Sequence, residues 1–371
     1  MASPELKVTD IIRTARNIRK QIEENDFAVD LKEPNIYYEE IIYKGETYDI
    51  PLIILKSRPC DWFLVGGGCS MCGYQLASAG KEVTGKELLE QFYRGLESLK
   101  SPESYPFILI SSSGSFFDPK EIGDDTRLEI LRSLAERGVS KMSCESRPEY
   151  LVDRRRLEAA KQAFKGEISV GIGLESSDDF IRRFCVNKGY KTRMYLRAVE
   201  AVREVGISHY DYILLGKPFL SPREDIEDAV ETIKFALDHD ATMAALMVTN
   251  LQPHTLTSEL FRRGLYDLPK LWAPLRVIEL LPESKRSLVA IKGVDKAAPM
   301  PLAFARNCDK CTPKVLDAII KWNYTRDYKF LETVQECCDC KNEWLNTIQT
   351  GETKPLQLRI AESLSQINQE L

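Results

Sequence analysis

The chain of 371 residues is 43% hydrophobic and 29% charged, so it can bury one large core or two smaller ones. This composition excludes a disordered chain, a collagen and a coiled-coil rod. The net charge of −5, from 51 basic and 56 acidic side chains, argues mildly against a large nucleic-acid footprint but leaves room for a local basic patch.

The N-terminal part of the sequence is charged and has helical periodicity. It predicts an amphipathic helix over residues 5–25 rather than a signal peptide, followed by an acidic link (EPNIYYEE). The longest apolar stretches, PLIIL (51–55) and residues 241–248, are too short to cross a bilayer. We therefore expect a soluble, cytoplasmic protein without a membrane partner.

Six short apolar segments then alternate with helical patterns. The predicted strands are 48–57, 107–116, 140–146, 167–176, 209–218 and 242–251, and the predicted helices lie near 85–100, 124–138, 153–164, 192–205 and 221–239. Such alternation is typical of buried parallel strands joined by right-handed crossovers. Six units favour an α/β fold with a partial (β/α)6 TIM-like barrel over a closed eightfold barrel, and a doubly wound sheet is the competing layout.

Polar side chains mark the carboxyl ends of several predicted strands. Glu145 and Arg147 end the third strand, Glu175 ends the fourth and Lys217 ends the fifth. A barrel collects its active site at this end of its strands, because the strand ends converge there. These residues therefore favour the barrel over the doubly wound sheet.

The alternation stops after about residue 252, which predicts three regions. Residues 1–45 form an N-terminal helical extension, 46–252 the partial barrel, and 253–371 a small C-terminal cysteine-rich metal-binding region. The last region contains two apolar segments, PLRVIELL (274–281) and SLVAIKG (287–293), and a terminal helix.

Eight of the ten cysteines fall in two groups, which indicates metal binding rather than a disulfide framework. In the first group, Cys60 follows the first strand, and Cys69 and Cys72 lie in GGGCSMCG, a C-x8-C-x2-C pattern. Three thiolates leave one iron of a four-iron cluster free for an external ligand. The alternative is a zinc site completed by a histidine, but none of the three histidines lies at ligand spacing.

A three-cysteine loop behind the first strand of a partial barrel resembles the radical S-adenosylmethionine (SAM) enzymes. The resemblance implies a [4Fe–4S] cluster whose open iron binds the amine and carboxylate of SAM, and a 5′-deoxyadenosyl radical formed by reductive cleavage. The usual spacing in this superfamily is C-x3-C-x2-C. The longer first gap here resembles branches such as the Elongator catalytic subunit.

The resemblance also implies which residues bind SAM. Gly114 and Ser115, in SSSGSFFD, match the segment for the SAM amino group, and Glu175, in GIGLES, matches the polar residue that ends the fourth strand. Arg147, in CESRPEY, is placed to face the SAM carboxylate or the substrate, and Asn187, in VNKGY, is a further cofactor-binding candidate. Taken singly, SSSGSF is also typical of a strand-to-helix turn and Glu175 of a helix cap. Their order behind the cysteines favours the cofactor.

A closer resemblance is to the radical SAM subunits of archaeosine synthase. It is carried by LIILKSRPCDWFLVGGGCSMCGY, SSGSFFD, ESRPEY, GIGLES with NKGY, LLGKPFLSPREDIEDA and the cysteine-rich tail. In that family a partner attaches lysine to a 7-deazaguanine base of tRNA, and the radical enzyme cleaves the lysine C–N bond. The resemblance implies a tRNA substrate, a lysine-transferring partner subunit and an electron donor such as ferredoxin or flavodoxin. Arg147 and Lys217 are then the candidate catalytic residues that hold the lysine moiety.

The second cysteine group pairs Cys308 and Cys311 with Cys337 and Cys340, each pair at CxxC spacing. Two such pairs predict a tetrahedral structural zinc site, and an auxiliary iron–sulfur cluster is the alternative. Cys338 is able to replace either neighbour as a ligand.

Two other functions remain open at this point. One is a radical SAM enzyme of the same architecture that acts on a small molecule or peptide. The other is a non-catalytic adaptor in which both cysteine groups are structural.

Overall fold

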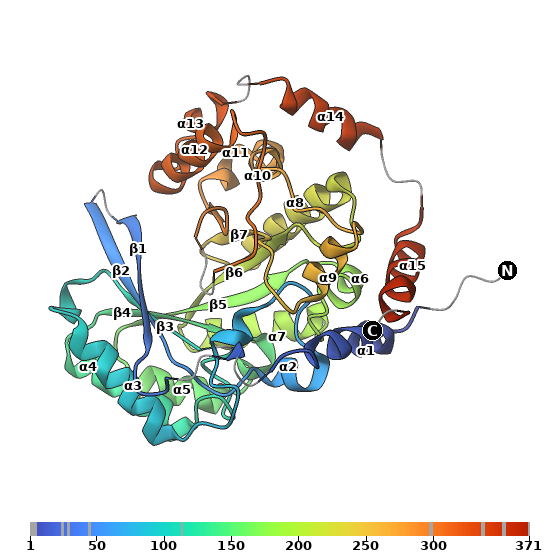
Figure 1. Cartoon of the computed structure of the whole chain (residues 1–371). Helices are drawn as coiled ribbons and strands as arrows, with labels where there is room; N and C mark the ends of the chain where they lie inside the picture. The colour runs from blue at the N-terminus through green and yellow to red at the C-terminus, as the bar shows by residue number, and fades with distance from the viewer. Residues whose placement is uncertain are drawn as a thin grey trace.

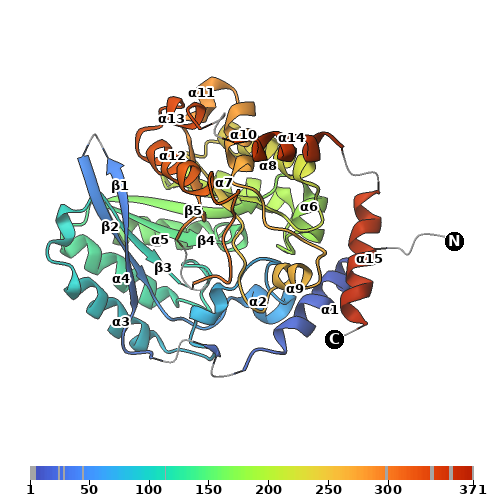
Figure 2. The ribbon, with the colours of Figure 1, turned by 45° about the horizontal axis from the view of Figure 1, so that its top comes forward.

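The computed structural model describes residues 6–23, 26–27, 30–43, 46–112, 114–296, 300–334, 338–350 and 354–369. In these residues a single sheet of eight strands, ordered β1 to β8 as in the chain, curls into an open half-barrel (Figure 1). β1 is antiparallel to β2, and every later pair is parallel. Figure 2 shows helices following the strands along the outer side of the curved sheet.

The elements have the following bounds. The strands are β1 (Asn35–Tyr43), β2 (Glu46–Ile54), β3 (Ile108–Ser111), β4 (Lys141–Ser146), β5 (Glu167–Glu175), β6 (Ser208–Leu215), β7 (Ala244–Val248) and β8 (Val289–Lys292). The helices are α1 (Val8–Arg19), α2 (Asp61–Gly66), α3 (Gly85–Ser98), α4 (Asp124–Glu136), α5 (Arg154–Ala163), α6 (Asp179–Phe184), α7 (Thr192–Glu204), α8 (Pro222–Asp238), α9 (Leu256–Arg262), α10 (Trp272–Leu280), α11 (Glu283–Arg286), α12 (Thr312–Thr325), α13 (Lys329–Glu332), α14 (Cys340–Thr350) and α15 (Leu356–Asn368).

The predicted α/β partial barrel is confirmed, and its six predicted strands are β2 to β7. The prediction of an acidic link was wrong. Most of the segment EPNIYYEE belongs to β1, which pairs with β2 over its whole length. Its polar composition suits an edge strand, where Tyr38 and Glu39 are exposed. The apolar segment SLVAIKG contains β8, so the sheet has two strands more than predicted.

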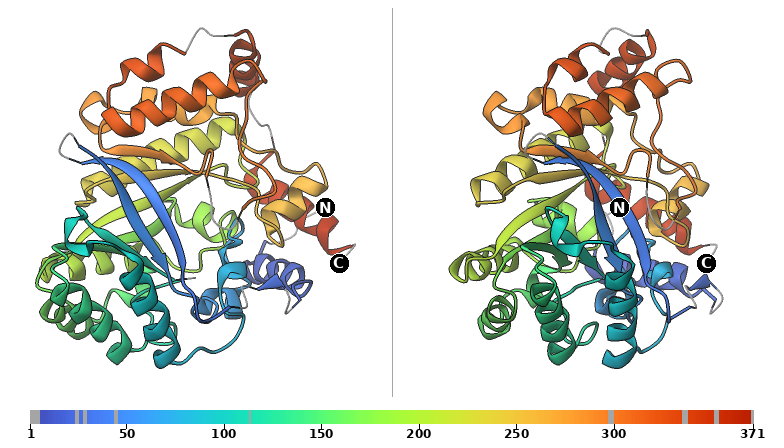
Figure 3. Two further views of the ribbon diagram at one scale, coloured as in Figure 1. Left: turned by 60° about the vertical axis from the view of Figure 1, so that its left-hand side comes forward. Right: turned by 90° about the vertical axis from the view of Figure 1, so that its left-hand side faces the viewer.

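The two edges of the sheet approach each other without pairing as strands in the described residues. Lys292 on β8 forms an ion pair with Glu39 on β1, and the Tyr324 hydroxyl on α12 donates to Glu40. Figure 3 shows the β1–β2 ribbon reaching toward the C-terminal helices. Side chains therefore bridge the gap that the backbone leaves in the barrel.

The described core has two parts. The larger part lies inside the barrel and between the sheet and its helices. The smaller part joins α1 and α15 to α6 and α9, and includes Ile11, Ile18, Leu260, Leu364 and Ile367. We call these four helices the terminal cap. Figure 2 shows α15 lying beside α1, although they are at opposite ends of the chain.

Local sequence explains where the main helices begin. Thr84 and Glu87 form a capping box at the start of α3, and Ser221 and Glu224 form another at α8, which has Pro222 in its first turn. None of the helices that the structure describes combines the length and the hydropathy needed for a bilayer crossing.

Candidate functional site

The first cysteine group lies in one loop at the carboxyl end of β2. Cys60 is buried directly before α2, and Cys69 and Cys72 follow that helix and are partly buried. The Cys60 amide donates to Gln75 Oε1 at 2.7 Å, and the Cys72 amide donates to the Cys69 carbonyl at 3.2 Å. The loop, which we call the cysteine loop (residues 60–72), thus brings the three predicted thiols to the active-site end of the barrel.

Asn187 fastens the cysteine loop from the segment after α6. Its φ of 51° lies in the left-handed region, which asparagine tolerates better than most residues. Its Nδ2 donates to the carbonyls of Gly66 and Gly68 at 2.9 and 2.7 Å, and its own carbonyl accepts from Trp62 Nε1 at 2.6 Å. The observed contacts of this predicted cofactor ligand are therefore with the loop that carries the thiols.

Arg147 lies where β4 ends, buried beside the same loop. Its Nε donates to Glu149 at 2.6 Å, its Nη2 donates to the Lys188 carbonyl at 2.7 Å, and its guanidinium lies 5.4 Å from the Trp62 ring centroid. Burial acts to lower the pKa of Arg147, but the charges of Glu149, Cys60 and Cys69 raise it above its usual range. A permanent cation is therefore held next to the thiols.

A second cation is held by Glu175, which ends β5 at a bulge with φ of 63°. Its Oε1 accepts from Lys188 Nζ at 2.8 Å, and both side chains are buried. Burial opposes the charge of Lys188, but Glu175 and Cys69 raise the pKa of Lys188. The structure thus brings Arg147, Glu175 and the cysteine loop together.

The segment after β3 passes between Cys60 and a buried carboxyl group that sequence reasoning missed. The Ser115 amide donates to Glu121 Oε2 at 2.8 Å, and the Ser115 hydroxyl accepts from the Arg147 amide at 3.1 Å. A Cβ added to Gly114 would lie 2.2 Å from Glu121 Oε1 and 2.8 Å from Cys60 Cβ, so this position requires glycine. Burial raises the pKa of Glu121 to about 8. Nothing in DPKEIG signals a buried acid.

Lys217 is buried in the segment that follows β6, but its ammonium group forms ion pairs with carboxylates of α8. Nζ lies 2.9 Å from Asp225 Oδ1 and 3.0 Å from Asp228 Oδ2. Among the described residues, its contacts are therefore with these carboxylates and the Leu214 carbonyl, and not with the cysteine loop. Of the two predicted catalytic residues, Arg147 alone lies beside the thiols.

A polar network lines the barrel wall near this site. Glu145 accepts from the Tyr212 hydroxyl at 2.6 Å and from the Ser111 hydroxyl at 2.7 Å, and the Tyr210 hydroxyl lies 3.4 Å from that of Tyr212. Burial raises the pKa of both tyrosines, so they stay neutral donors. The alternation in HYDYILL was the available signal, since it places both tyrosines on one face of β6.

The second cysteine group forms a compact cluster before α12 and at the start of α14. The sulfurs of Cys308 and Cys338 are 3.7 Å apart and those of Cys311 and Cys340 are 3.8 Å apart, and all four lie within 4.8 Å of one another. Cys337, which the spacing predicts as a ligand, lies outside the described residues. Cys338 is the described residue that completes the group.

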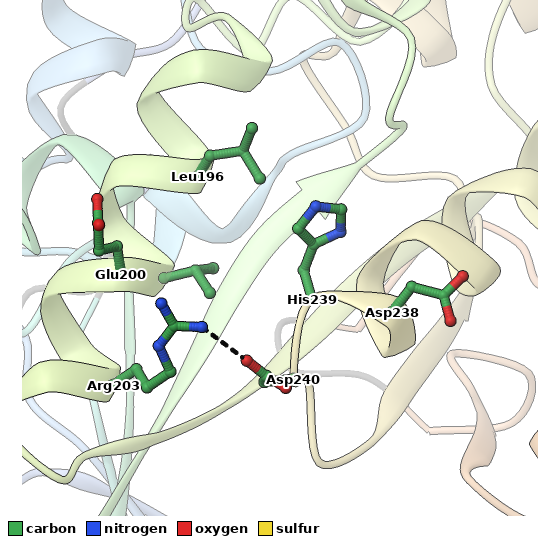
Figure 4. Close-up of a pocket in the computed structure, with 7 residues that line it drawn as sticks. Leu196, Glu200, Arg203, Asp238, His239 and Asp240 are labelled. Atoms are coloured by element: carbon green, nitrogen blue, oxygen red, sulfur yellow. Dashed lines mark hydrogen bonds and ion pairs between the residues drawn. The ribbon is translucent and has the colours of Figure 1, made fainter.

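A hollow elsewhere on the molecule lies between the ends of α7 and α8 (Figure 4). It is lined by residues that include Leu196, Arg203, His239 and Asp240, and Arg203 forms a 3.1 Å ion pair with Asp240. These helices end just before β6 and β7, so the hollow lies at the amino ends of the strands. It is therefore separate from the cysteine loop.

Comparison with known proteins gives one family and a consistent set of relatives. Residues 66–236 match the radical SAM superfamily. The chain is 30% identical over 303 residues to archaeosine synthase subunit beta of Methanosarcina acetivorans, covering 80% of this chain and 84% of that protein. It is 28% identical over 305 residues to archaeosine synthase subunit beta of Thermococcus kodakarensis, covering 81% and 91%.

Among solved structures, the archaeal Methanocaldococcus infernus Elp3 has a TM-score of 0.46 and 16% identity, covering 62% of this chain and 57% of that one.

Proposed function

Because the chain belongs to the radical SAM family and is related over most of its length to archaeosine synthase subunit beta, we propose that it forms archaeosine in tRNA. The proposed reaction cleaves the lysine C–N bond of a lysine-modified 7-deazaguanine base. The observation that carries the proposal is one loop with three thiols, placed with Arg147 and Glu175 at the carboxyl end of the barrel. The relatives named as beta subunits support the choice of substrate.

The residues of the cysteine loop fit a [4Fe–4S] cluster. Cys60, Cys69 and Cys72 would hold it, while Gly114, Ser115 and Glu175 would bind SAM beside it, with Asn187 holding the loop. Three thiolates carry negative charge, and the structure supplies Arg147 and Lys188 as buried cations next to them. When bound, the cluster supplies the electron for reductive cleavage of SAM, and the radical so formed abstracts hydrogen from the substrate.

The barrel wall offers groups for the lysine moiety of the substrate. Arg147 is a cation suited to a carboxylate, and Glu145, with its Tyr212 and Ser111 donors, is suited to an ammonium group. Lys217 remains a weaker candidate for this role, because Asp225 and Asp228 already occupy its ammonium. The buried ring of Tyr190 and the half-buried rings of Tyr210 and Tyr212 would help to exclude water from the radical.

For the second cysteine group we propose a single zinc ion bound by Cys308, Cys311, Cys338 and Cys340. Zn–S bonds of about 2.3 Å place the sulfurs of a tetrahedral site about 3.8 Å apart. The observed separations of 3.7 and 3.8 Å match that spacing. An auxiliary four-iron cluster binds each thiolate to a different iron and so spreads the sulfurs more widely.

The relatives are named as beta subunits, which supports a partner subunit for this chain, the proposed source of the lysine-modified tRNA. A small electron carrier such as ferredoxin or flavodoxin is the proposed reductant.

The test begins with anaerobic reconstitution of the protein, followed by dithionite and SAM. The wild type should form 5′-deoxyadenosine and methionine, and Cys60→Ala should form neither. Cys144→Ala is the matched control, since Cys144 is also buried but lies inside β4. If the wild type forms no 5′-deoxyadenosine, the proposed enzyme activity is wrong, and the remaining function is the non-catalytic adaptor in which both cysteine groups are structural.

The substrate is tested by adding lysine-modified tRNA and measuring the nucleoside mass. Conversion to archaeosine is the expected result. SAM cleavage without archaeosine, together with failure to bind tRNA with or without the partner subunit, would favour a small-molecule or peptide substrate.

A further inference from the structure

The cysteine loop is held from outside the barrel by one buried arginine of α1. Arg19, the last residue of that helix, is 9% exposed. Its Nε donates to the Gly67 carbonyl at 3.2 Å, and its Nη2 donates to the carbonyls of Cys72 and Cys69 at 2.5 and 3.5 Å. One guanidinium thus spans the part of the loop that carries two of the thiols.

These contacts do not use all the N–H groups of Arg19. A guanidinium has five N–H groups in a rigid fork, and Nη1 is buried with no partner among the described residues. Leaving a buried charged donor unpaired is unfavourable, because the N–H group has lost its water and gained no acceptor. Phe63 covers the guanidinium on one side, with its ring centroid 5.2 Å away. The arrangement therefore holds a desolvated cation with free donors beside Cys69 and Cys72.

The surroundings of Arg19 fix it in place. Arg16 donates to the Val65 carbonyl, and a Cβ added to Gly67 would lie 2.8 Å from the Arg16 amide, so the loop packs directly on the α1 backbone. The helix itself is anchored by the terminal cap, where the Asn368 amide donates to the Thr14 hydroxyl at 2.9 Å. This anchoring means that Arg19 is positioned by packing from both ends of the chain.

We propose that Arg19 contacts the iron–sulfur cluster without ligating it, and that its free N–H groups donate to a cluster sulfur or to the thiolate of Cys69 or Cys72. The inference rests on the proposed assignment of a [4Fe–4S] cluster to the cysteine loop. One-electron reduction, by the electron carrier, adds negative charge to the cluster without breaking a bond. A buried cation stabilises that charge, because hydrogen bonds to the sulfurs and local charge set the reduction potential.

The test compares Arg19→Gln and Arg19→Lys with the wild type in the reconstituted full chain. Iron content and the midpoint potential of the cluster are measured without SAM, by reductive titration followed by electron paramagnetic resonance. Arg19→Gln should shift the midpoint to more negative potential. A tenfold loss in the reduced-to-oxidised ratio at fixed ambient potential corresponds to about 59 mV for a one-electron couple. Arg19→Lys keeps the charge and should shift less.

Arg13→Gln is the matched control, because Arg13 lies on the same helix, is 65% exposed and pairs with Asp10. It should leave the midpoint unchanged. Arg19→Gln with full iron content and an unchanged midpoint overturns the proposal.

A second measurement covers the case in which Arg19→Gln fails to keep iron. In protein with ¹⁵N-labelled arginine, the reduced cluster should show a nitrogen hyperfine coupling that Arg19→Lys removes. The same coupling in both proteins overturns the contact. Iron content that stays at the wild-type level when Cys60, Cys69 and Cys72 are all changed to alanine would instead refute the cluster assignment itself, which keeps the two failures distinct.

Discussion

Arg147 and Lys217 looked equivalent in the sequence, since both are cations at the carboxyl end of a predicted strand. In the structure, Arg147 lies beside the thiols of the cysteine loop, whereas Lys217 lies between two carboxylates of α8. Strand position alone predicted that both would lie at the active-site end of the barrel. It did not show which carboxylates fold back onto them, because that depends on how α8 packs against β6.

The ion cluster around Lys217 predicts a large effect on stability. Lys217→Met leaves Asp225 and Asp228 buried without their cation, so the free energy of unfolding should fall by about 3–5 kcal/mol. Urea denaturation measures this, and the triple variant with Asp225→Asn and Asp228→Asn should recover much of the loss. Lys234→Met is the control, because its pair with Glu231 is exposed. A stable Lys217→Met protein without SAM cleavage would instead support a catalytic role.

Asp211, buried in β6, predicts a pH effect on stability. Its Oδ2 accepts from Tyr195 at 2.6 Å, His209 Nε2 lies 3.7 Å away, and Glu175 is the other charge that acts on it. Burial raises the pKa of Asp211 to about 8 from an ordinary value of 3.8. The folded state therefore keeps a proton that the unfolded state loses, so this residue reduces stability as pH rises from about 4 to 8.

Asp211→Asn removes that ionisation and keeps an acceptor for Tyr195. Relative to the wild type, the variant should gain roughly 1 to 3 kcal/mol of unfolding free energy between about pH 5 and pH 8. Parallel urea titrations at the two pH values measure the gain. An equal difference at both values would show that Asp211 ionises normally in the folded protein.

Among the elements, the strands that the sequence predicted were those with continuous apolar runs, β2 to β7. β1 was missed because an exposed antiparallel edge strand needs no apolar run, and its Tyr38 and Glu39 read as a polar link. β8 is short, and only its pairing with β7 distinguishes it from an isolated apolar segment. The three thiols of the cysteine loop were predictable from spacing. The supports at Asn187, Glu121 and Arg19 were not, because each depends on long-range contacts.

The cysteine group before α12 and α14 predicts one zinc ion per chain. In a variant with Cys60, Cys69 and Cys72 changed to alanine, metal analysis should find about one zinc and little iron, as expected of a single tetrahedral site. Cys338→Ser should lower the zinc content and loosen α14, as seen by faster proteolysis, whereas Cys337→Ser should leave both unchanged. Zinc loss in Cys337→Ser alone would assign the ligand to Cys337 instead.

At the scale of the whole molecule, the terminal cap is connected to the cysteine loop by a continuous series of contacts. α15 packs on α1 through Ile360, Leu364 and Ile367, and α1 carries Arg19 to the loop. Arg359 on α15 also donates to the Phe219 carbonyl and pairs with Glu224 of α8 at 2.6 Å. Damage to the last helix should therefore be transmitted to the cysteine loop, which is distant in sequence.

Leu364→Ala tests this connection. Removing a buried leucine side chain should reduce stability by about 2–4 kcal/mol. Because the cap holds Arg19, iron should also be lost to a chelator several times faster than from the wild type. Leu280→Ala is the control, since Leu280 is helical but 43% exposed. A destabilised Leu364→Ala protein that loses iron at the wild-type rate would show that the cap and the loop are independent.

The hydrogen bond between Thr14 and Asn368 also has a consequence for the order in which contacts form during synthesis. During translation α1 and the cysteine loop leave the ribosome early, but the helix that anchors α1 is made only after every strand of the barrel. Contacts between such distant segments form late, because a long loop must close first. For most of its synthesis the nascent chain therefore carries its three cysteines next to a helix, α1, that α15 does not yet anchor.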